Sequence, residues 1–253
     1  MKLTGNTILI TGGGSGIGKA LAKAFYDKGN KVIIAGRQAD KLEAVASAFP
    51  GMTFMTVDMT SLASITAFSE KIIAEHPDLN VIINNAGIMI PEDLLTAPAN
   101  LEIAERTVLT NLLGPIRLTS SLLPHLMHQK SSTIMMVTSG LAFVPLVMTP
   151  TYNATKAALH SYSIALRQQL KDTSTEVIEI IPPYVQTELM GTQQASDPHA
   201  MPLADFIDEV MLLLEKNNGT AEIVVERCKP LRYAAETHTF GQTFTMLNQQ
   251  HSQ

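Results

Sequence analysis

The chain has 253 residues, of which 45% are hydrophobic and 16% are charged, and its formal net charge is −5. This much apolar sequence excludes a disordered chain and is enough to build a large core. An acidic chain without a basic patch is not expected to bind nucleic acid.

Short β-rich segments alternate with helical segments along the chain. Several of the β-rich segments are continuous apolar runs, which is typical of strands buried on both faces of a parallel sheet. The predicted strands are 7–11, 31–35, 53–57, 79–83, 133–138, 176–181 and 221–225. A predicted helix runs from about Ile17 to Gly29, and further helices are predicted over 39–49, 62–75, 100–129 and 153–171. This order predicts one α/β domain over 1–253, with a doubly wound parallel seven-stranded sheet.

Two later segments carry weaker signals. The segment from Thr187 to about Asp208 is rich in Gly, Gln, Ser and Pro, and we expect a mobile insertion with few side chains anchored to the core. The tail after Arg227 has little helix or strand signal. It nevertheless contains apolar residues that we expect to pack against the rest of the protein: Leu231, Tyr233, Phe240 and Phe244.

The first predicted strand leads into a glycine-rich loop and then a helix. Such a loop lets backbone N–H groups approach a pyrophosphate at the helix N-terminus, where the helix dipole favours an anion. The residues concerned are Gly12, Gly14, Ser15, Gly16, Ile17 and Gly18. A tight turn without a ligand is the alternative interpretation. The loop has no Gly-Lys-Ser/Thr ending, which excludes a nucleoside triphosphatase loop.

The ends of the second and third strands bear on the choice of cofactor. An acidic residue that would bind the ribose 2′-hydroxyl of NAD is absent, because Gly36 stands there and Arg37 follows. A guanidinium suits the 2′-phosphate of NADP, although Arg37 could also be an ordinary solvated residue. Asp58 could accept a hydrogen bond from adenine or cap the next helix.

Tyr152 and Lys156 provide the clearest chemical pattern. At positions i and i+4 they share one face of a helix, and a nearby cation lowers the high pKa of a phenol. Ser139 ends the fifth strand, at the edge where open α/β sheets bind ligands. The turn that contains Asn85, Ala86 and Gly87 follows the fourth strand at the same edge.

These motifs together resemble the short-chain dehydrogenase/reductase family in its subtype of about 250 residues. The resemblance extends from Thr7 to about Glu226 and implies a Rossmann fold. It also implies a catalytic tetrad of Asn111, Ser139, Tyr152 and Lys156, in which Asn111 sits where the family interrupts a helix to hold a relay water. The cofactor contacts that it implies are Gly12, Gly14, Ser15, Gly16, Ile17, Gly18, Arg37, Asp58, Asn85, Ala86, Gly87, Tyr152, Lys156, Pro182, Val185 and Thr187.

The sequence also departs from the family pattern. Pro183 replaces the glycine that usually follows the sixth strand, which should stiffen the loop. This Pro-Pro pair and the tail at 240–244 are similar to bacterial reductases encoded beside lipoteichoic-acid D-alanylation genes. In the family, segments around Met89, Met148, Met190 and Met201 border the substrate cleft. No spacing among the seven histidines and one cysteine is typical of a metal site, so none is expected.

The sequence therefore predicts an oxidoreductase that transfers a hydride between NADP(H), favoured over NAD(H), and a small-molecule carbonyl or secondary alcohol. The alternatives are a non-catalytic dinucleotide-binding regulator and an epimerase or dehydratase, for which the chain is too short. A substrate lid is expected at about 188–208. Helices 101–129 and 152–171 pair in the family, which implies a homodimer or homotetramer.

The single cysteine, Cys228, excludes an intramolecular disulfide and favours a reducing compartment. No signal peptide and no run of about 18 apolar residues is evident. We therefore expect a cytoplasmic protein that does not enter a membrane.

Overall fold

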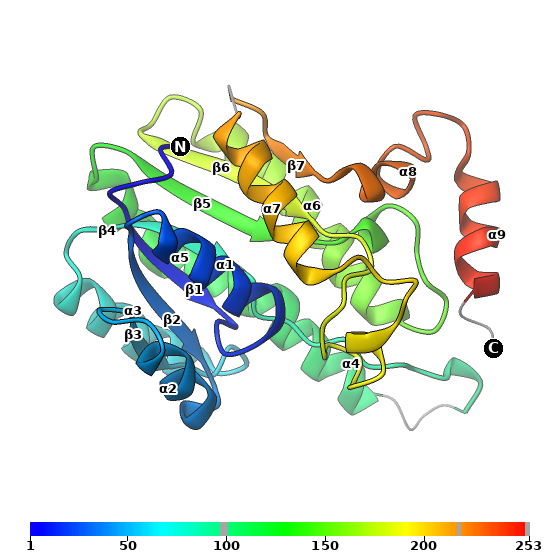
Figure 1. Cartoon of the computed structure of the whole chain (residues 1–253), viewed down its shortest axis with the longest axis horizontal. Helices are drawn as coiled ribbons and strands as arrows, with labels where there is room; N and C mark the ends of the chain where they lie inside the picture. Colours follow the sequence, from blue (N-terminus) through cyan, green and yellow to red (C-terminus); the bar gives the residue numbers. More distant parts are fainter. Residues whose placement is uncertain (97–100, 217–218, 251–253) are drawn as a thin grey trace.

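The computed structural model describes residues 1–96, 101–216 and 219–250 (Figure 1). Their centre is a parallel seven-stranded sheet in the order β3-β2-β1-β4-β5-β6-β7, which confirms the predicted doubly wound Rossmann fold in a single domain. The strands are β1 Thr7–Thr11, β2 Lys31–Gly36, β3 Thr53–Thr56, β4 Leu79–Asn84, β5 Ser132–Val137, β6 Thr175–Ile181 and β7 Glu222–Val224. The order reverses between β1 and β4, where such sheets open a crevice for a ligand.

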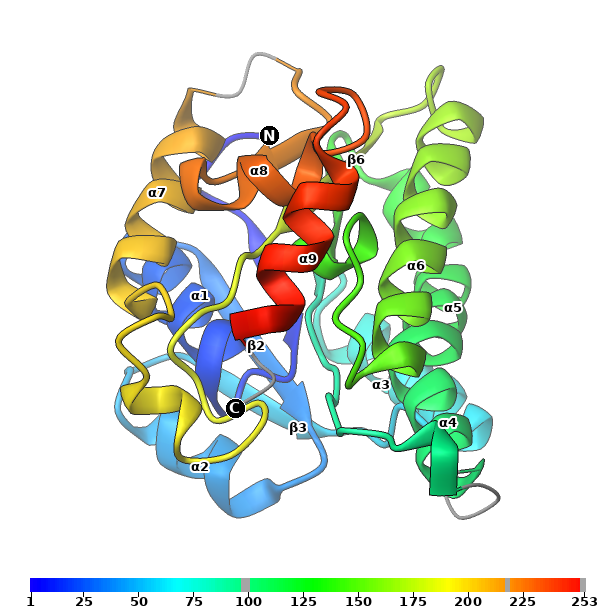
Figure 2. The ribbon, with the colours of Figure 1, turned by 90° about the vertical axis from the view of Figure 1, so that its right-hand side faces the viewer.

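Helices cover both faces of the sheet (Figure 2). One face is covered by α1 Gly16–Asp27, α2 Ala39–Ser47 and α7 Leu203–Glu215. The other is covered by α3 Leu62–Glu75, α5 Gly114–His128 and α6 Pro150–Gln169. The remaining helical elements are α4 Leu101–Val108, α8 Lys229–Arg232, α9 Phe240–Gln250 and the short turns Leu94–Thr96, Leu109–Leu113, Gly140–Ala142, Gln194–Ser196 and Glu226–Cys228. Within the described ranges, no helix is long and apolar enough to cross a bilayer.

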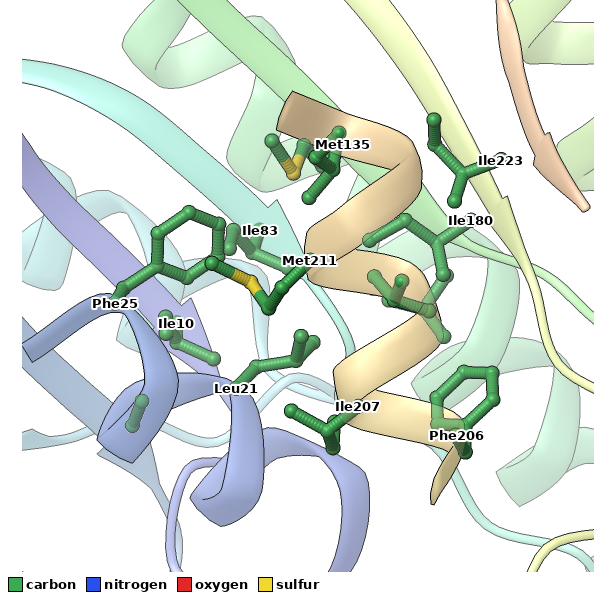
Figure 3. Packing of buried hydrophobic residues seen from close by; sticks show 14 of the residues in the cluster. Ile10, Leu21, Phe25, Ile83, Met135, Ile180, Phe206, Ile207, Met211 and Ile223 are labelled. Carbon is green, nitrogen blue, oxygen red and sulfur yellow. The ribbon is translucent and has the colours of Figure 1, made fainter. Parts of the chain in front are cut away.

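The core between the sheet and the first helical layer is built from large apolar side chains (Figure 3). Phe25 of α1 and Phe206 of α7 are fully buried, and Met211 lies between α7 and the sheet. Their partners on the strands include Ile10, Ile83, Met135, Ile180 and Ile223. This layer fixes the ends of β1, β4, β5 and β6, where the polar residues of interest lie.

The predicted helix 100–129 is divided in the structure. α4 ends at Val108, a π-helical turn occupies Leu109–Leu113, and α5 begins at Gly114; residue 100 lies outside the described residues. A Cβ on Gly114 would lie 2.8 Å from the Met59 carbonyl oxygen, so glycine allows the chain segments to approach here. A π turn inserts one extra residue into a helix and is often found at functional sites.

Three helices, α7, α8 and α9, were missed by the sequence analysis. Residues 203–208 were assigned to a mobile insertion, but they form the first turns of α7, whose Phe206, Val210 and Leu214 are buried at helical spacing. The tail forms α8 and α9 instead of irregular structure. Two of the four residues expected to pack, Leu231 and Phe244, are half-buried, whereas Tyr233 and Phe240 are exposed.

Candidate active site

A cavity of about 830 Å³ lies at the carboxyl ends of β1, β4, β5 and β6. It runs from the glycine-rich loop to α9, which crosses this edge of the sheet in Figure 2. A volume of this size is typical of sites for cofactors and small molecules. The predicted site residues that line it are Gly12, Ser15, Gly16, Ile17, Asn85, Ala86, Gly87, Ser139, Tyr152, Lys156, Pro182, Val185 and Thr187.

The glycine-rich loop packs tightly against the end of β4. Gly12 has φ +69°, and a Cβ there would lie 2.8 Å from Asn85 Nδ2. A Cβ on Gly18 would overlap the Gly12 carbonyl, so Gly18 lies behind the loop rather than in the cavity wall. No side chain caps the N-terminus of α1. The loop therefore presents backbone at the helix end, and this cradle fits the pyrophosphate of a dinucleotide.

The turn after β4 is fastened to the first strand through Thr11. Thr11 Oγ1 accepts hydrogen bonds from the backbone N–H groups of Asn85 and Ala86, both at 3.1 Å. Asn85 Nδ2 donates to the Thr11 carbonyl at 2.9 Å. These three bonds hold two loops from distant parts of the chain together as one wall of the cavity.

Asn111 lies in the π-helical turn and is fully buried, so it does not line the cavity. Its Oδ1 accepts from the Ile88 N–H and its Nδ2 donates to the Ile88 carbonyl, each at 2.8 Å. A Cβ on Gly87 would lie 3.4 Å from Asn111 Oδ1 and 3.8 Å from Lys156 Nζ. Asn111 therefore holds the backbone that separates it from Lys156.

Ser139, Tyr152 and Lys156 line the same cavity. Ser139 caps the turn Gly140–Ala142, where its Oγ accepts from the Leu141 N–H at 3.1 Å. Tyr152 and Lys156 lie in the first two turns of α6, and Lys156 Nζ is 5.6 Å from the centre of the Tyr152 ring. Lys156 Nζ donates to the Val137 carbonyl at 2.8 Å, which ties the helix to the end of β5.

Burial shifts the pKa of both titratable groups toward the neutral forms. Burial raises the pKa of Tyr152 to about 12, and a hydrogen bond with Ser139 lowers it in part. Burial lowers the pKa of Lys156 to about 8, against the attraction of the Glu179 carboxylate. We expected the Lys156 cation to lower the pKa of Tyr152; in the structure desolvation of the phenol is the larger influence.

The two residues expected around the adenosine, Arg37 and Asp58, do not line the cavity. Arg37 is exposed at the end of β2. Asp58 is half-buried; its Oδ1 accepts from Thr60 N and Oγ1, and the Thr60 backbone bond is the main cause of its lowered pKa. Ser61, not Asp58, caps α3. A Cβ on Gly14 would lie 3.4 Å from Cβ of Lys41, a cation that sequence analysis missed.

The segment after β6 is held more firmly than its composition indicated. Met201 pairs with Val185, and Gln194 Nε2 donates to the Val185 carbonyl at 2.8 Å and to Thr187 Oγ1 at 3.2 Å. Tyr184 donates to Asp197 at 3.0 Å. The expectation of few anchors is therefore wrong, because buried amide and backbone groups replace the apolar contacts on which it was based.

The end of the cavity away from the glycine loop is apolar. Met89, Leu146 and Tyr152 form its buried cluster, against which Leu141, Met148, Met190 and Leu247 pack. Met201, expected here, is instead part of the core beside α7 and does not line the cavity. The contribution of Leu247 was missed because it comes from α9, a helix that the sequence analysis did not predict.

Comparisons with known proteins show the family to which the chain belongs. Residues 6–198 match the family model for short chain dehydrogenases. The chain is 40% identical over 253 residues to the uncharacterized oxidoreductase DltE of Bacillus subtilis (strain 168), across 99% of both chains. This match also confirms the similarity to reductases encoded beside D-alanylation genes.

Two solved structures show the same fold over almost the whole chain. A short chain dehydrogenase from Burkholderia cenocepacia, in complex with NADP, has a TM-score of 0.79 at 22% identity, with 98% of this chain and 99% of that chain covered. One from Burkholderia phymatum, in complex with NAD, has a TM-score of 0.82 at 17% identity, with 98% and 97% covered. The chain therefore belongs to the short-chain dehydrogenase/reductase family and is an oxidoreductase that acts on CH–OH or C=O groups.

Proposed function

We propose that the protein transfers a hydride between NADP(H) and an uncharged, apolar carbonyl compound or the corresponding secondary alcohol. The observation that carries this proposal is the meeting of Ser139, Tyr152 and Lys156 in one cavity with the glycine-rich loop. When bound, the nicotinamide supplies the hydride chemistry. The protein supplies orientation, a proton and a fixed charge.

Each polar group then has a separate task. The Tyr152 hydroxyl, neutral because it is buried, donates its proton to the carbonyl oxygen. The Ser139 hydroxyl hydrogen-bonds the same oxygen and orients it. The Lys156 ammonium holds ribose hydroxyls and provides positive charge near the phenol. Asn111 supports this arrangement by holding the backbone at Ile88 beside the lysine.

The preference for NADP(H) over NAD(H) is supported by the charges at the start of α2. Gly36 leaves room where a carboxylate would repel a phosphate, and Arg37 follows it. Gln38 gives α2 no side-chain cap, so the helix N-terminus is available to an anion. The first turn of α2 also contains Lys41, whose Cβ borders Gly14, next to the acidic Asp40.

The shape of the apolar end supports a substrate without charge. Met89, Met148 and Met190 offer flexible side chains that adapt to apolar groups of different shape. Two acidic residues after Thr187, Glu188 and Asp197, line the same cavity and would repel an anionic substrate. We also propose that residues 188–202 act as a substrate lid, that the protein is a homodimer or homotetramer, and that it works in the cytoplasm.

The experiment is a turnover assay with NADPH and with NADH. The carbonyl panel contains 2-octanone, acetophenone and phenanthrenequinone, with oxidation of L-serine as the polar comparison. We expect NADPH-dependent reduction of the apolar compounds, and Tyr152→Phe should lower kcat by about 10²- to 10⁴-fold while the fold is retained. A Phe variant with wild-type kcat would falsify the mechanism and favour the non-catalytic regulator.

A further inference from the structure

A buried carboxylate lies directly behind the proposed site. Glu179 is on β6, which runs between β5 and β7, and its side chain has no exposed surface. It does not line the cavity, and the sequence analysis did not single it out. An unpaired charge at such a place is strongly unfavourable, so its partners indicate what it does.

Both hydrogen-bonding partners of Glu179 adjoin residues of the site. Thr138 Oγ1 donates to Glu179 Oε1 at 2.6 Å, and Thr138 immediately precedes Ser139. His160 Nδ1 lies 2.8 Å from Glu179 Oε2, a hydrogen-bond distance, and His160 is one helical turn after Lys156 on α6. The carboxylate therefore bridges the end of β5 and the face of α6 that carries the lysine.

The hydrogen bond of the Lys156 ammonium does not balance its positive charge. Its ammonium is buried, and its hydrogen bond goes to the neutral Val137 carbonyl. The charged group that opposes the effect of burial on its pKa is Glu179. Tyr152 is neutral until far above neutral pH, because burial raises its pKa to about 12.

The other charged groups around Glu179 are already paired with one another. Glu222 is its register partner on β7 and receives two bonds from Arg232, at 2.6 and 3.1 Å. Arg232 also binds Glu236 at 2.7 Å and stacks over Phe143, whose ring meets the edge of His160. His160, Glu179 and Glu222 come close enough to ligate a metal, but Arg232 and Thr138 already occupy their carboxylates.

We propose that Glu179 is a positioning residue: fixed by Thr138 and His160, its carboxylate balances the buried charge of Lys156 and keeps the ammonium in place beside Tyr152. This inference rests on the proposed function for the role of Lys156. It adds a residue outside the cavity on which the charge of the lysine depends.

The consequence is a defined pH dependence. Since Tyr152 stays protonated, the alkaline limb of carbonyl reduction reports the loss of the proton from Lys156. Removal of the Glu179 charge leaves burial unopposed and lowers the pKa of Lys156 further. Glu179→Gln should therefore move the alkaline limb of kcat/KM to lower pH by about one unit, which is about a tenfold loss at pH above the limb.

The test compares Glu179→Gln with a matched control. Glu176→Gln removes a carboxylate from the same strand, where Glu176 is half-exposed and pairs with the N-terminal ammonium at 2.8 Å. Reduction of phenanthrenequinone with NADPH is followed from about pH 6 to about pH 10. We expect the limb to shift in Glu179→Gln and not in Glu176→Gln. Identical profiles for Glu179→Gln and wild type would overturn the proposal.

A binding measurement separates this inference from the proposed function. The Kd for NADPH, followed by nicotinamide fluorescence, should rise with pH, and in Glu179→Gln the rise should begin about one unit lower. This shift is expected even if no carbonyl compound is reduced, whereas absence of turnover alone counts against the function only. If Glu179→Gln does not fold, Thr138→Val tests the same point, because it removes the hydrogen bond to Glu179. We expect a smaller shift in the same direction, and an unchanged pH profile would contradict the proposal.

Discussion

At the scale of single residues, burial determines which forms of the acid–base groups exist before the cofactor binds. Burial raises the pKa of Tyr152 to about 12 and lowers that of Lys156 to about 8. A neutral phenol is the form that donates a proton to a carbonyl, whereas alcohol oxidation needs the phenolate. The site without cofactor therefore favours reduction, and oxidation depends on positive charge that stabilises the phenolate.

Arg37 allows a direct test of cofactor choice. Arg37→Ala removes the guanidinium proposed to bind the 2′-phosphate, and a hydrogen bond to a charged group contributes about 1.5–3 kcal/mol. We expect the Kd for NADPH to rise about 10- to 100-fold, with little change for NADH. Fluorescence titration measures both values. Lys71→Ala, which removes an exposed cation from α3, is the control for net charge; equal losses for both cofactors would show that Arg37 does not recognise the phosphate.

The residues that could be predicted are those whose relation is local in sequence. Tyr152 and Lys156 stand one helical turn apart, so their spacing alone places them on one face of α6. Glu179 could not be assigned in this way, because its contacts with Thr138 and His160 depend on the pairing of β5 with β6. The same holds for Asn111, whose hydrogen bonds reach Ile88 from another element.

At the scale of elements, buried strands were easier to predict than surface helices. Each of the seven strands begins and ends within about two residues of its predicted bounds, because continuous apolar runs mark them clearly. The first residues of α7, up to about Asp208, were assigned to the preceding polar segment, although Phe206, Val210 and Leu214 recur every four residues. α9 has no acidic first turn and no basic last turn, so little in its sequence marked a helix.

The two halves of the proposed lid are held differently. Gln194 and Met201 bind the backbone around Val185. In 188–193, which lines the cavity, the Leu189 N–H donates to Thr187 Oγ1 at 3.4 Å and the Met190 N–H donates to Gln194 Oε1 at 2.9 Å. Closure over the site would exclude water from the reacting carbonyl. We therefore expect NADP to increase protection from hydrogen exchange at 188–193 and to change 194–202 little.

Hydrogen exchange with and without NADP measures this difference peptide by peptide. The glycine loop at 12–18 is the internal positive control, because it contacts the cofactor in any version of the site. If that loop becomes protected while 188–193 does not change, the segment is not a lid.

At the scale of the whole molecule, two helical layers cover the sheet, and the outer surface of α6 carries few large polar side chains. Up to Ala165, its exposed residues are small or apolar and recur along one side of the helix: Ala154, Ala157, Ser161, Ile164 and Ala165. The exposed Gln168 and Gln169 follow at its C-terminal end. Small side chains allow the backbones of two helices to approach closely. Ile164 is 49% exposed on this face, and packing it against another surface would bury apolar area.

The face of α6 therefore predicts self-association through a two-fold axis, in which each helix packs against its copy or against α5 of the partner. Ala157→Arg places a long cation in the middle of this face, away from Lys156, which points into the cavity. We expect wild type to sediment as a dimer or tetramer at micromolar concentration and the Ala157→Arg variant to sediment as a smaller species.

Ala63→Arg, on the exposed side of α3, is the matched control and should leave the association state unchanged. Because the cation lies outside the cavity, the variant should still bind NADPH, so loss of association with retained binding would separate assembly from folding. A wild-type monomer at micromolar concentration would refute the prediction.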